Sequence, residues 1–328
     1  ELVSNWGEFN SYLSQVVSRI YPQAPHYANE MVNKTRLSSQ ISNARRILFT
    51  NLFDKESEEA LGYEAHLFPP DKTIYLSLFK QKGFHQKVGE NWQLAEPTDD
   101  TFQPIWQEFL AFLEASKQTK RPLNEFVDVV SSRPFKVKKG LMDFLLPLFL
   151  LVKRESFALY FEGTRFIPNL SGDTLDLLIR KPQDYSVKAF HVEGVRLEVF
   201  NHYRELLSQA TTEELSTKSF ISTIIPFLTF YKELKPYAKQ TSGITKEAQR
   251  LREAITKATD PEKSFFEDFP QALGFSLSEL NDSPEKLEVY FEQLRSCIKE
   301  IQTCYDILLE RFEEYIRKDV LGLKASVE

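Results

Sequence analysis

Hydrophobic and polar residues follow one another along most of this chain with the period of an α-helix, which predicts a mainly helical protein. The first helical segment is residues 5–20, where the apolar side chains fall on one face. These are Trp6, Phe9, Leu13, Val16, Val17 and Ile20. Only 11 of the 328 residues are glycine, and runs with strand-like alternation are few, so the same fold class is favoured again.

We predict an N-terminal helical domain over residues 1–100. Arg45 and Arg46 lie on the side of one of its helices away from the apolar face, which indicates a solvated surface or, alternatively, a grip on phosphate or on an acidic partner. His85 follows Gly83, and as a catalytic base it would need a neighbouring carboxylate or nucleophile that the sequence does not place there, so we expect an ordinary loop histidine. The predicted helices of this domain cover 26–35, 40–53 and 71–82, and a polar loop covers 86–100.

Residues 101–190 are predicted to form a winged-helix-like domain. Three helices, at 104–117, 122–131 and about 141–152, are followed by a hairpin closed at Glu162-Gly163. A further short strand at 185–190 is expected to extend the hairpin. Three helices followed by a hairpin is the order of elements in a winged helix.

The composition of the third helix indicates which function this domain has. Residues 141–152 are apolar almost all round, and a helix of this kind is buried. A helix that reads DNA bases instead presents polar side chains to the major groove, so we favour a scaffold or docking role. The alternative is non-specific phosphate contact by cations at the two ends of the helix and on the wing. These are Lys136, Lys138, Lys139, Lys153, Arg154 and Arg165.

Residues 191–328 are predicted to form a C-terminal helical bundle. Its last helix, 283–318, has apolar residues separated alternately by four and three positions, which is a heptad seam. Packing of this seam inside the same chain is favoured, and an interface with another protein is the sharper alternative. The residues of that candidate interface are Leu287, Phe291, Leu294, Ile298, Ile301, Tyr305 and Leu308. Other predicted helices cover 194–209, 219–234 and 245–259, and an aromatic segment at 261–275 is expected to pack them together.

Composition and motifs narrow the function classes. The net charge of −6 argues against a dedicated nucleic-acid binder. Cys297 and Cys304 are seven residues apart in one predicted helix, about 10 Å along its axis, which is too far for a disulfide, so we expect reduced thiols in a cytoplasmic protein. The sequence carries no phosphate-binding loop, dinucleotide-binding fingerprint, zinc motif or nucleophile elbow, and no run long enough to cross a membrane. We therefore expect no enzyme, no cofactor and no metal within these residues.

Several segments that together span most of the chain resemble one known family. They include Asn29-Glu30, Ala44-Arg45-Arg46, Phe68-Pro69-Pro70-Asp71-Lys72, Gly83-Phe84-His85, the stretch 134–168, Ile225-Pro226-Phe227 and Ser264-Phe265-Phe266-Glu267-Asp268-Phe269-Pro270. They are similar to a region of very large bacterial P-loop ATPases of phage-defence islands, of the BREX-associated kind. The resemblance implies a region that follows the ATPase domain, and it supplies no site residues. Because the sequence starts at Glu1 without Met, we also expect a fragment of a longer protein.

The working hypothesis is therefore an interaction and regulatory region that mediates assembly of a larger ATPase-type defence protein. Its expected partners are other domains or subunits of the defence complex, and no membrane. The alternative is a nucleic-acid-binding winged-helix module, for which DNA would be the partner.

Overall fold

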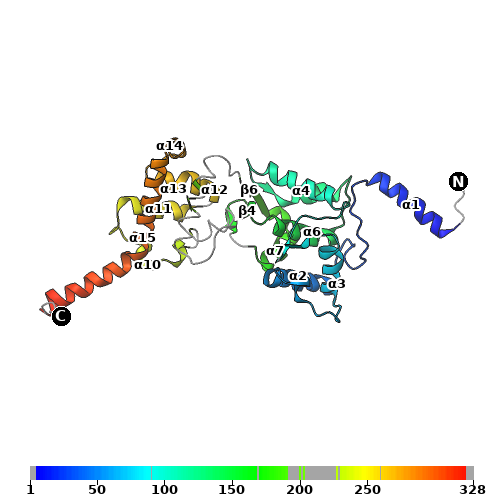
Figure 1. Ribbon diagram of the computed structural model, residues 1–328, viewed down its shortest axis with the longest axis horizontal. Helices are drawn as coiled ribbons and strands as arrows, with labels where there is room; N and C mark the ends of the chain where they lie inside the picture. The colour runs from blue at the N-terminus through cyan, green and yellow to red at the C-terminus, as the bar shows by residue number, and fades with distance from the viewer. Residues whose placement is uncertain are drawn as a thin grey trace. The chain divides into compact units, whose positions relative to one another are not determined.

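The computed structural model describes residues 5–89, 91–167, 170–190, 199–200, 202–203, 227, 230–258 and 260–322. The chain divides into two compact units, residues 1–189 and residues 190–328. With 63% helix and 8% strand, the fold is mainly helical, as predicted, and it includes a long C-terminal helix (Figure 1). The boundary between the units falls between residues 189 and 190, and one hydrophobic core extends through unit 1 from Tyr27 to Ala189.

Unit 1 combines α-helices with two small sheets. Its helices are α1 (Trp6–Ile20), α2 (Ser39–Lys55), η1 (Glu59–Gly62), α3 (Pro70–Ile74), η2 (Tyr75–Lys80), α4 (Gln103–Ala115), α5 (Leu123–Ser131), α6 (Lys139–Val152), α7 (Gly172–Arg180) and η3 (Pro182–Asp184). Its strands are β1 (His85–Val88), β2 (Asn91–Leu94), β3 (Arg121–Pro122), β4 (Phe157–Phe161), β5 (Arg165–Ile167) and β6 (Tyr185–Ala189). The side chain of Ser38 caps α2 by accepting a hydrogen bond from the Ile41 amide.

The larger sheet is antiparallel, with strand order β3-β6-β4-β5. The predicted hairpin of β4 and β5 is present, and its turn contains Glu162 and Gly163 with φ angles of 48° and 70°. The predicted extra strand is also present as β6. It lies between β4 and β3, with Val187 opposite both Leu159 and Arg121. Strand β3 was not predicted, because two residues are too few to show the alternation of apolar and polar positions that indicates a strand.

Helix α6 forms the centre of unit 1, as its apolar sequence predicted. Every residue from Gly140 to Leu151 is buried except Asp143. The ring of Phe149 lies 5.2 Å from Trp106, 5.4 Å from Phe109 and 6.2 Å from Phe126, measured between centroids. Each fully buried side chain of this size contributes roughly 1.5–3 kcal/mol, so the burial of α6 stabilises the unit.

The start of α6 depends on a glycine. The Gly140 amide donates to the Lys34 carbonyl oxygen at 2.8 Å, which draws the preceding loop onto the helix. A Cβ at this position would lie 2.6 Å from the same oxygen and would also overlap the Val32 carbonyl. Only glycine therefore allows this close approach.

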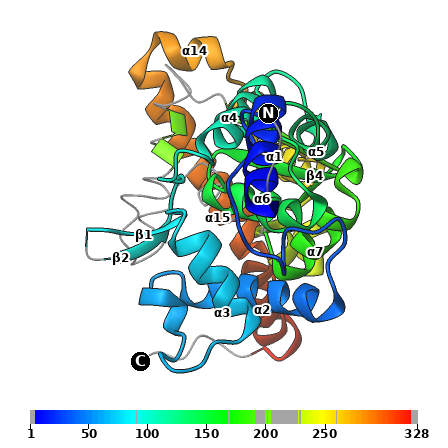
Figure 2. The same ribbon diagram turned by 90° about the vertical axis from the view of Figure 1, so that its right-hand side faces the viewer.

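Two local predictions in unit 1 were wrong. Residues 26–35 form turns and not a helix, because Asn29 Oδ1 accepts from the Met31 amide and its Nδ2 donates to Ser77, which are the side-chain bonds of a turn. The predicted polar loop at 86–100 contains the hairpin of β1 and β2, which lies at one margin of the unit (Figure 2). The ring of Trp92 lies against His85, and this contact holds the hairpin on the core.

Unit 2 is helical in its described part. It contains α10 (Pro236–Gln240), α11 (Lys246–Lys257), α12 (Pro261–Lys263), η4 (Ser264–Asp268), α13 (Phe269–Ala272), α14 (Leu277–Asp282), α15 (Pro284–Tyr315) and η5 (Ile316–Val320). The side chains of Thr245 and Ser283 cap α11 and α15. The aromatic segment supplies buried Phe265, Phe266 and Phe269 to the core. Most of the helices predicted at 194–209 and 219–234 fall outside the described residues.

Candidate functional site

The six cations proposed for phosphate contact do not form one patch around α6. Lys136, Lys138 and Lys139 lie at its N-terminal end, and Lys153 and Arg154 lie just beyond its C-terminal end. A helix of 14 residues is about 21 Å long, so α6 separates the two groups by about two nanometres. Arg165 is exposed and lies on a different element, strand β5.

Three of these cations already contact groups of unit 1. The ammonium of Lys138 donates to the Asn33 carbonyl at 3.3 Å, and that of Lys153 lies 5.6 Å from the Trp106 ring centroid. The guanidinium of Arg154 pairs with Glu56 at 2.9 Å. The Glu56 carboxylate offsets the charge of Arg154, and the other two contacts hold the ammonium groups of Lys138 and Lys153 against unit 1.

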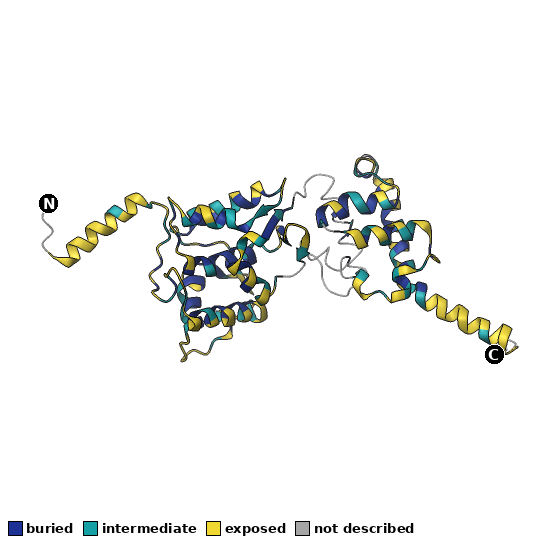
Figure 3. Ribbon diagram, turned by 180° about the vertical axis from the view of Figure 1, so that it is seen from behind, coloured by how far each residue is buried: buried dark blue, intermediate teal, exposed yellow. Residues whose placement is uncertain are grey.

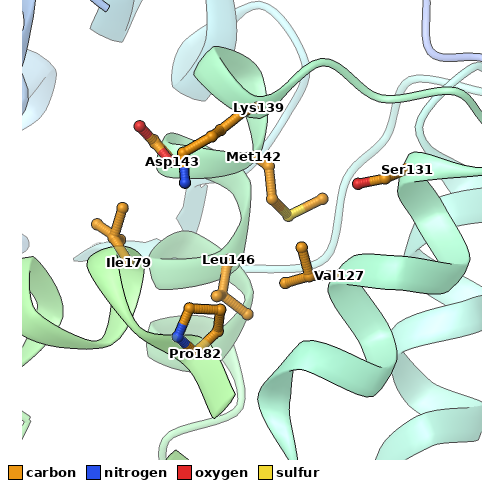
Figure 4. Close-up of a pocket in the computed structure, with 8 residues that line it drawn as sticks. All are labelled: Val127, Ser131, Lys139, Met142, Asp143, Leu146, Ile179 and Pro182. Atoms are coloured by element: carbon orange, nitrogen blue, oxygen red, sulfur yellow. The ribbon is translucent and has the colours of Figure 1, made fainter. Parts of the chain in front are cut away.

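A pocket opens beside α6, between α5, α7 and η3 (Figure 4). Its volume is about 120 Å³. Apolar side chains form most of the wall, and Ser131, Lys139 and Asp143 are the polar members. The apolar lining residues are Val127, Met142, Leu146, Ile179 and Pro182. Sequence reasoning did not find this pocket, although Asp143 stood out as the one acid in the apolar run of α6.

Asp143 belongs to a cluster of charges that joins α2, α6 and α7. The guanidinium of Arg45 lies 3.4 Å from Asp143 and 3.0 Å from Asp176, and Arg46 also pairs with Asp176. Arg45 is buried, so the expectation of a solvated helix face was wrong for this residue, while Arg46 remains half-exposed. The sequence could not show this, because the two carboxylates come from helices about 100 and 130 positions away along the chain.

The pKa values of the two carboxylates in this cluster are shifted in opposite directions. Burial raises the pKa of Asp143 to about 6, and the opposing attraction of Arg45 is too weak to reverse the shift. Burial would also raise the pKa of Asp176, but hydrogen bonds from Arg46 and Arg45 outweigh it and lower the pKa. The cluster therefore links α2, α6 and α7. Within it, the charged form of Asp143 is less well stabilised than that of Asp176.

His85 is a buried structural residue. Its Nε2 lies 2.7 Å from the Glu56 carbonyl oxygen, which can only accept, so Nε2 donates. The Tyr75 hydroxyl then donates to Nδ1 at 2.8 Å. Burial lowers the pKa of His85 and favours this neutral form. Both ring nitrogens are occupied, so the geometry gives no support to a catalytic base.

The motif at residues 68–72 is likewise structural. Lys72 is buried, and its ammonium donates to the carbonyl oxygens of Ala65 at 3.1 Å and Leu67 at 2.7 Å. It also lies 4.2 Å from the Phe68 ring centroid. The lysine closes the loop that precedes α3.

The heptad seam of α15 changes its surroundings along the helix. Leu287, Phe291, Leu294 and Ile301 are buried in the core of unit 2, and Ile298 is partly buried against it. These residues are therefore not on a free surface. Tyr305 is half-buried, and its ring contacts Tyr237 of α10 and Lys235.

Beyond Tyr305 the seam of α15 is exposed. Every residue from 306 to 315 is exposed, as the yellow end of this helix shows (Figure 3). Leu308 is 37% exposed, Phe312 59% and Tyr315 57%, and Leu309 beside them is 46% exposed. We call these four residues the α15 stripe. The spacing of apolar residues predicted the seam. It did not show at which residue of α15 the core of unit 2 stops burying that seam.

Helix α1 is exposed to a similar degree. All of its residues except Val16 are exposed, including Trp6, Leu13 and Val17 of its apolar face. The helix is properly capped, because the Asn5 side chain accepts from the Glu8 amide at 2.9 Å.

Searches for known relatives identify no family for this chain. No family model, no curated protein and no solved structure matches it. Among the residues that the structure describes, no cluster of three or more histidine, cysteine or acidic side chains could hold a metal ion. Within the same residues, no helix combines the length and the apolar character that a membrane crossing requires.

Proposed function

We propose that this chain is a non-catalytic interaction region, and that the α15 stripe is the surface through which it binds another domain or subunit. The observation that carries the proposal is the change in exposure along one uninterrupted helix. The same heptad pattern that is buried at Leu294 continues as exposed leucine and aromatic side chains at Leu308 and Phe312. Covering apolar surface contributes roughly 25 cal/mol per Å², so such a stripe favours a bound helix.

Two further observations support an assembly role. The resemblance to bacterial defence ATPases suggests an ATPase domain, or another subunit of such a complex, as the partner. The elements α4, β3, α5, α6, β4 and β5 follow one another in the order expected of a winged helix, and β6, which comes later in the chain, lies between β3 and β4 in the sheet. Because α6 is buried, we infer that this winged-helix-like module serves as a scaffold.

The experiment compares partner recovery for three forms of the protein in its native host: wild type, Phe312→Glu and Glu310→Gln. Both substituted residues are exposed on α15, so the unfolding transition of unit 2 should not change. A partner recovered with wild type and Glu310→Gln but lost with Phe312→Glu is the expected result. An identical set of partners for all three forms would remove the proposal.

The alternative function, non-specific DNA binding, has less support from the geometry. Its cations lie at opposite ends of α6, and several contact groups of their own unit. Fluorescence anisotropy with labelled duplex DNA at low salt, using wild type and a Lys136/Lys138/Lys139→Glu variant, separates the two functions. We expect no salt-sensitive binding that depends on these lysines.

A further inference from the structure

The pocket beside α6 is formed by helices that the core of unit 1 holds in place. Four of its lining residues follow one another at spacings of three, one and three positions, which places them on one face of α6. They are Lys139, Met142, Asp143 and Leu146. Val127 and Ser131 of α5 lie on one side of this face (Figure 4). Ile179 of α7 lies on the other, and Pro182 of η3 completes the lining.

The carboxylate of Asp143 lacks donors in this lining. Its side chain is only 14% exposed, and its ion pair with Arg45 is long, at 3.4 Å. A carboxylate can accept about four hydrogen bonds, yet no group among the described residues donates one to Asp143. Burial raises the pKa of Asp143 to about 6 despite the opposing attraction of Arg45 and Lys139. Because Asp143 lines the pocket, a ligand there can supply the missing donor.

The charges around Asp143 restrict the head group of such a ligand. Arg45 approaches the carboxylate from α2, and Lys139 is an exposed cation one turn away on α6. A cationic head would be repelled by both residues, and an anionic head would be repelled by Asp143. A neutral hydroxyl avoids both repulsions. It has one proton to donate to the carboxylate, and its lone pairs can accept from the Lys139 ammonium.

The remaining lining requires an apolar body of limited size. Met142, Leu146 and Ile179 are buried, and the lining is mostly hydrocarbon. Apolar cavities of about 150 Å³ can hold benzene, so the smaller volume of this pocket, about 120 Å³, sets an upper limit of one ring. The site therefore suits a compact hydrocarbon group that carries one hydroxyl.

We propose that the pocket between α5, α6 and α7 binds a small neutral hydroxyl compound, whose hydrocarbon body packs on Met142 and Leu146 and whose hydroxyl donates to Asp143. This site lies in unit 1 and is independent of the proposed role of the α15 stripe. A ligand of about seven non-hydrogen atoms binds weakly, so we expect a dissociation constant of about a millimolar for phenol.

The two methionines of the chain allow a direct test. Met142 lines the pocket, whereas Met31 is not among the lining residues. In the whole chain labelled with ¹³C-methyl methionine, a titration with phenol should move the NMR signal of Met142 saturably and leave that of Met31 in place. Met31→Leu assigns the two signals. A Met142 signal that does not respond to phenol would overturn the proposal.

A series of ligands with the same ring tests the choice of head group. Toluene has no donor, benzylammonium is a cation and benzoate is an anion. We expect phenol to bind about tenfold more tightly than toluene, because a hydrogen bond to a charged acceptor is gained. The two charged compounds should bind more weakly than phenol. Equal affinities for phenol and toluene, or tighter binding of either ion, would contradict the assignment of a neutral hydroxyl.

Variants of the pocket locate the site. Val127→Phe should fill the pocket and abolish the response of Met142, whereas Val129→Phe, on the same helix at an exposed position outside the lining, should leave it unchanged. Asp143→Asn should weaken phenol about tenfold and leave toluene unchanged, because only the hydroxyl uses the charged acceptor. The tryptophan fluorescence transition shows whether each variant is folded. Unaltered binding in Val127→Phe, or an unaltered preference for phenol in Asp143→Asn, would refute this placement of the ligand.

Discussion

A matched pair of leucines on α15 tests how this helix is divided between core and surface. Leu294 and Leu308 occupy equivalent positions of the same heptad seam, two heptads apart. Leu294 is 0% exposed within the core of unit 2, whereas Leu308 is 37% exposed. Replacing each by alanine removes the same atoms from the same helix, so the difference in cost reports packing alone.

The structure sets the expected magnitudes. Leu294→Ala removes a fully buried side chain from the core of unit 2, and buried leucine-to-alanine changes cost about 2–5 kcal/mol. We expect about 3 kcal/mol in the free energy of unfolding of unit 2. Leu308→Ala leaves no buried cavity, and alanine is a good helix former, so its cost should be below about 1 kcal/mol.

The positions of the tryptophans allow the two units to be measured separately. Trp6, Trp92 and Trp106 all belong to residues 1–189. Urea unfolding followed by tryptophan fluorescence therefore reports unit 1, and circular dichroism at 222 nm reports both units. Leu294→Ala should shift a transition seen by circular dichroism and leave the fluorescence transition in place. Equal costs for the two alanine variants would refute the division of α15 described above.

Further predictions concern the core of unit 1 and use the tryptophan signal. Asp176→Asn should cost about 3 kcal/mol, because a buried arginine loses its 3.0 Å partner. Asp143→Asn should cost less at neutral pH, and wild type should lose stability relative to this variant as pH rises from about 4 to about 6, because the folded state holds that proton more tightly. For His85→Gln the slope is opposite: wild type should lose stability relative to the variant as pH falls below 6.5, through the lowered pKa of His85. Gly140→Ala should destabilise unit 1 strongly, whereas Gly172→Ala, where an added Cβ meets open space, should have little effect. Flat pH profiles, or equal costs for the two glycine variants, would contradict these assignments.

The sequence by itself determined the features that depend on local physics. The apolar run of α6 required burial, because no polar side exists that could face water. The alternating four- and three-residue spacing of apolar positions located α15, and the hairpin turn at Glu162-Gly163 located β4 and β5. In each case neighbouring residues contain the whole signal, either as a periodicity or as a turn.

The tertiary structure alone decided where charged and aromatic residues find their partners. Arg45 looked solvated because its carboxylate partners are supplied by α6 and α7, far along the chain. His85 looked like a loop residue because Tyr75 and the Glu56 carbonyl reach it only after folding. A pattern along the chain cannot contain such contacts, because their cost and benefit depend on desolvation by distant segments.

The tertiary structure also decided which part of each amphipathic helix is buried. The heptad seam of α15 is equally apolar at Leu294 and at Leu308, so the sequence treats the two positions alike. Only the packing of unit 2 shows that its core ends near Tyr305, and only the exposure of α1 shows that its apolar face is uncovered. Apolar periodicity states that a face must be buried, and the fold decides whether the chain itself or a partner buries it.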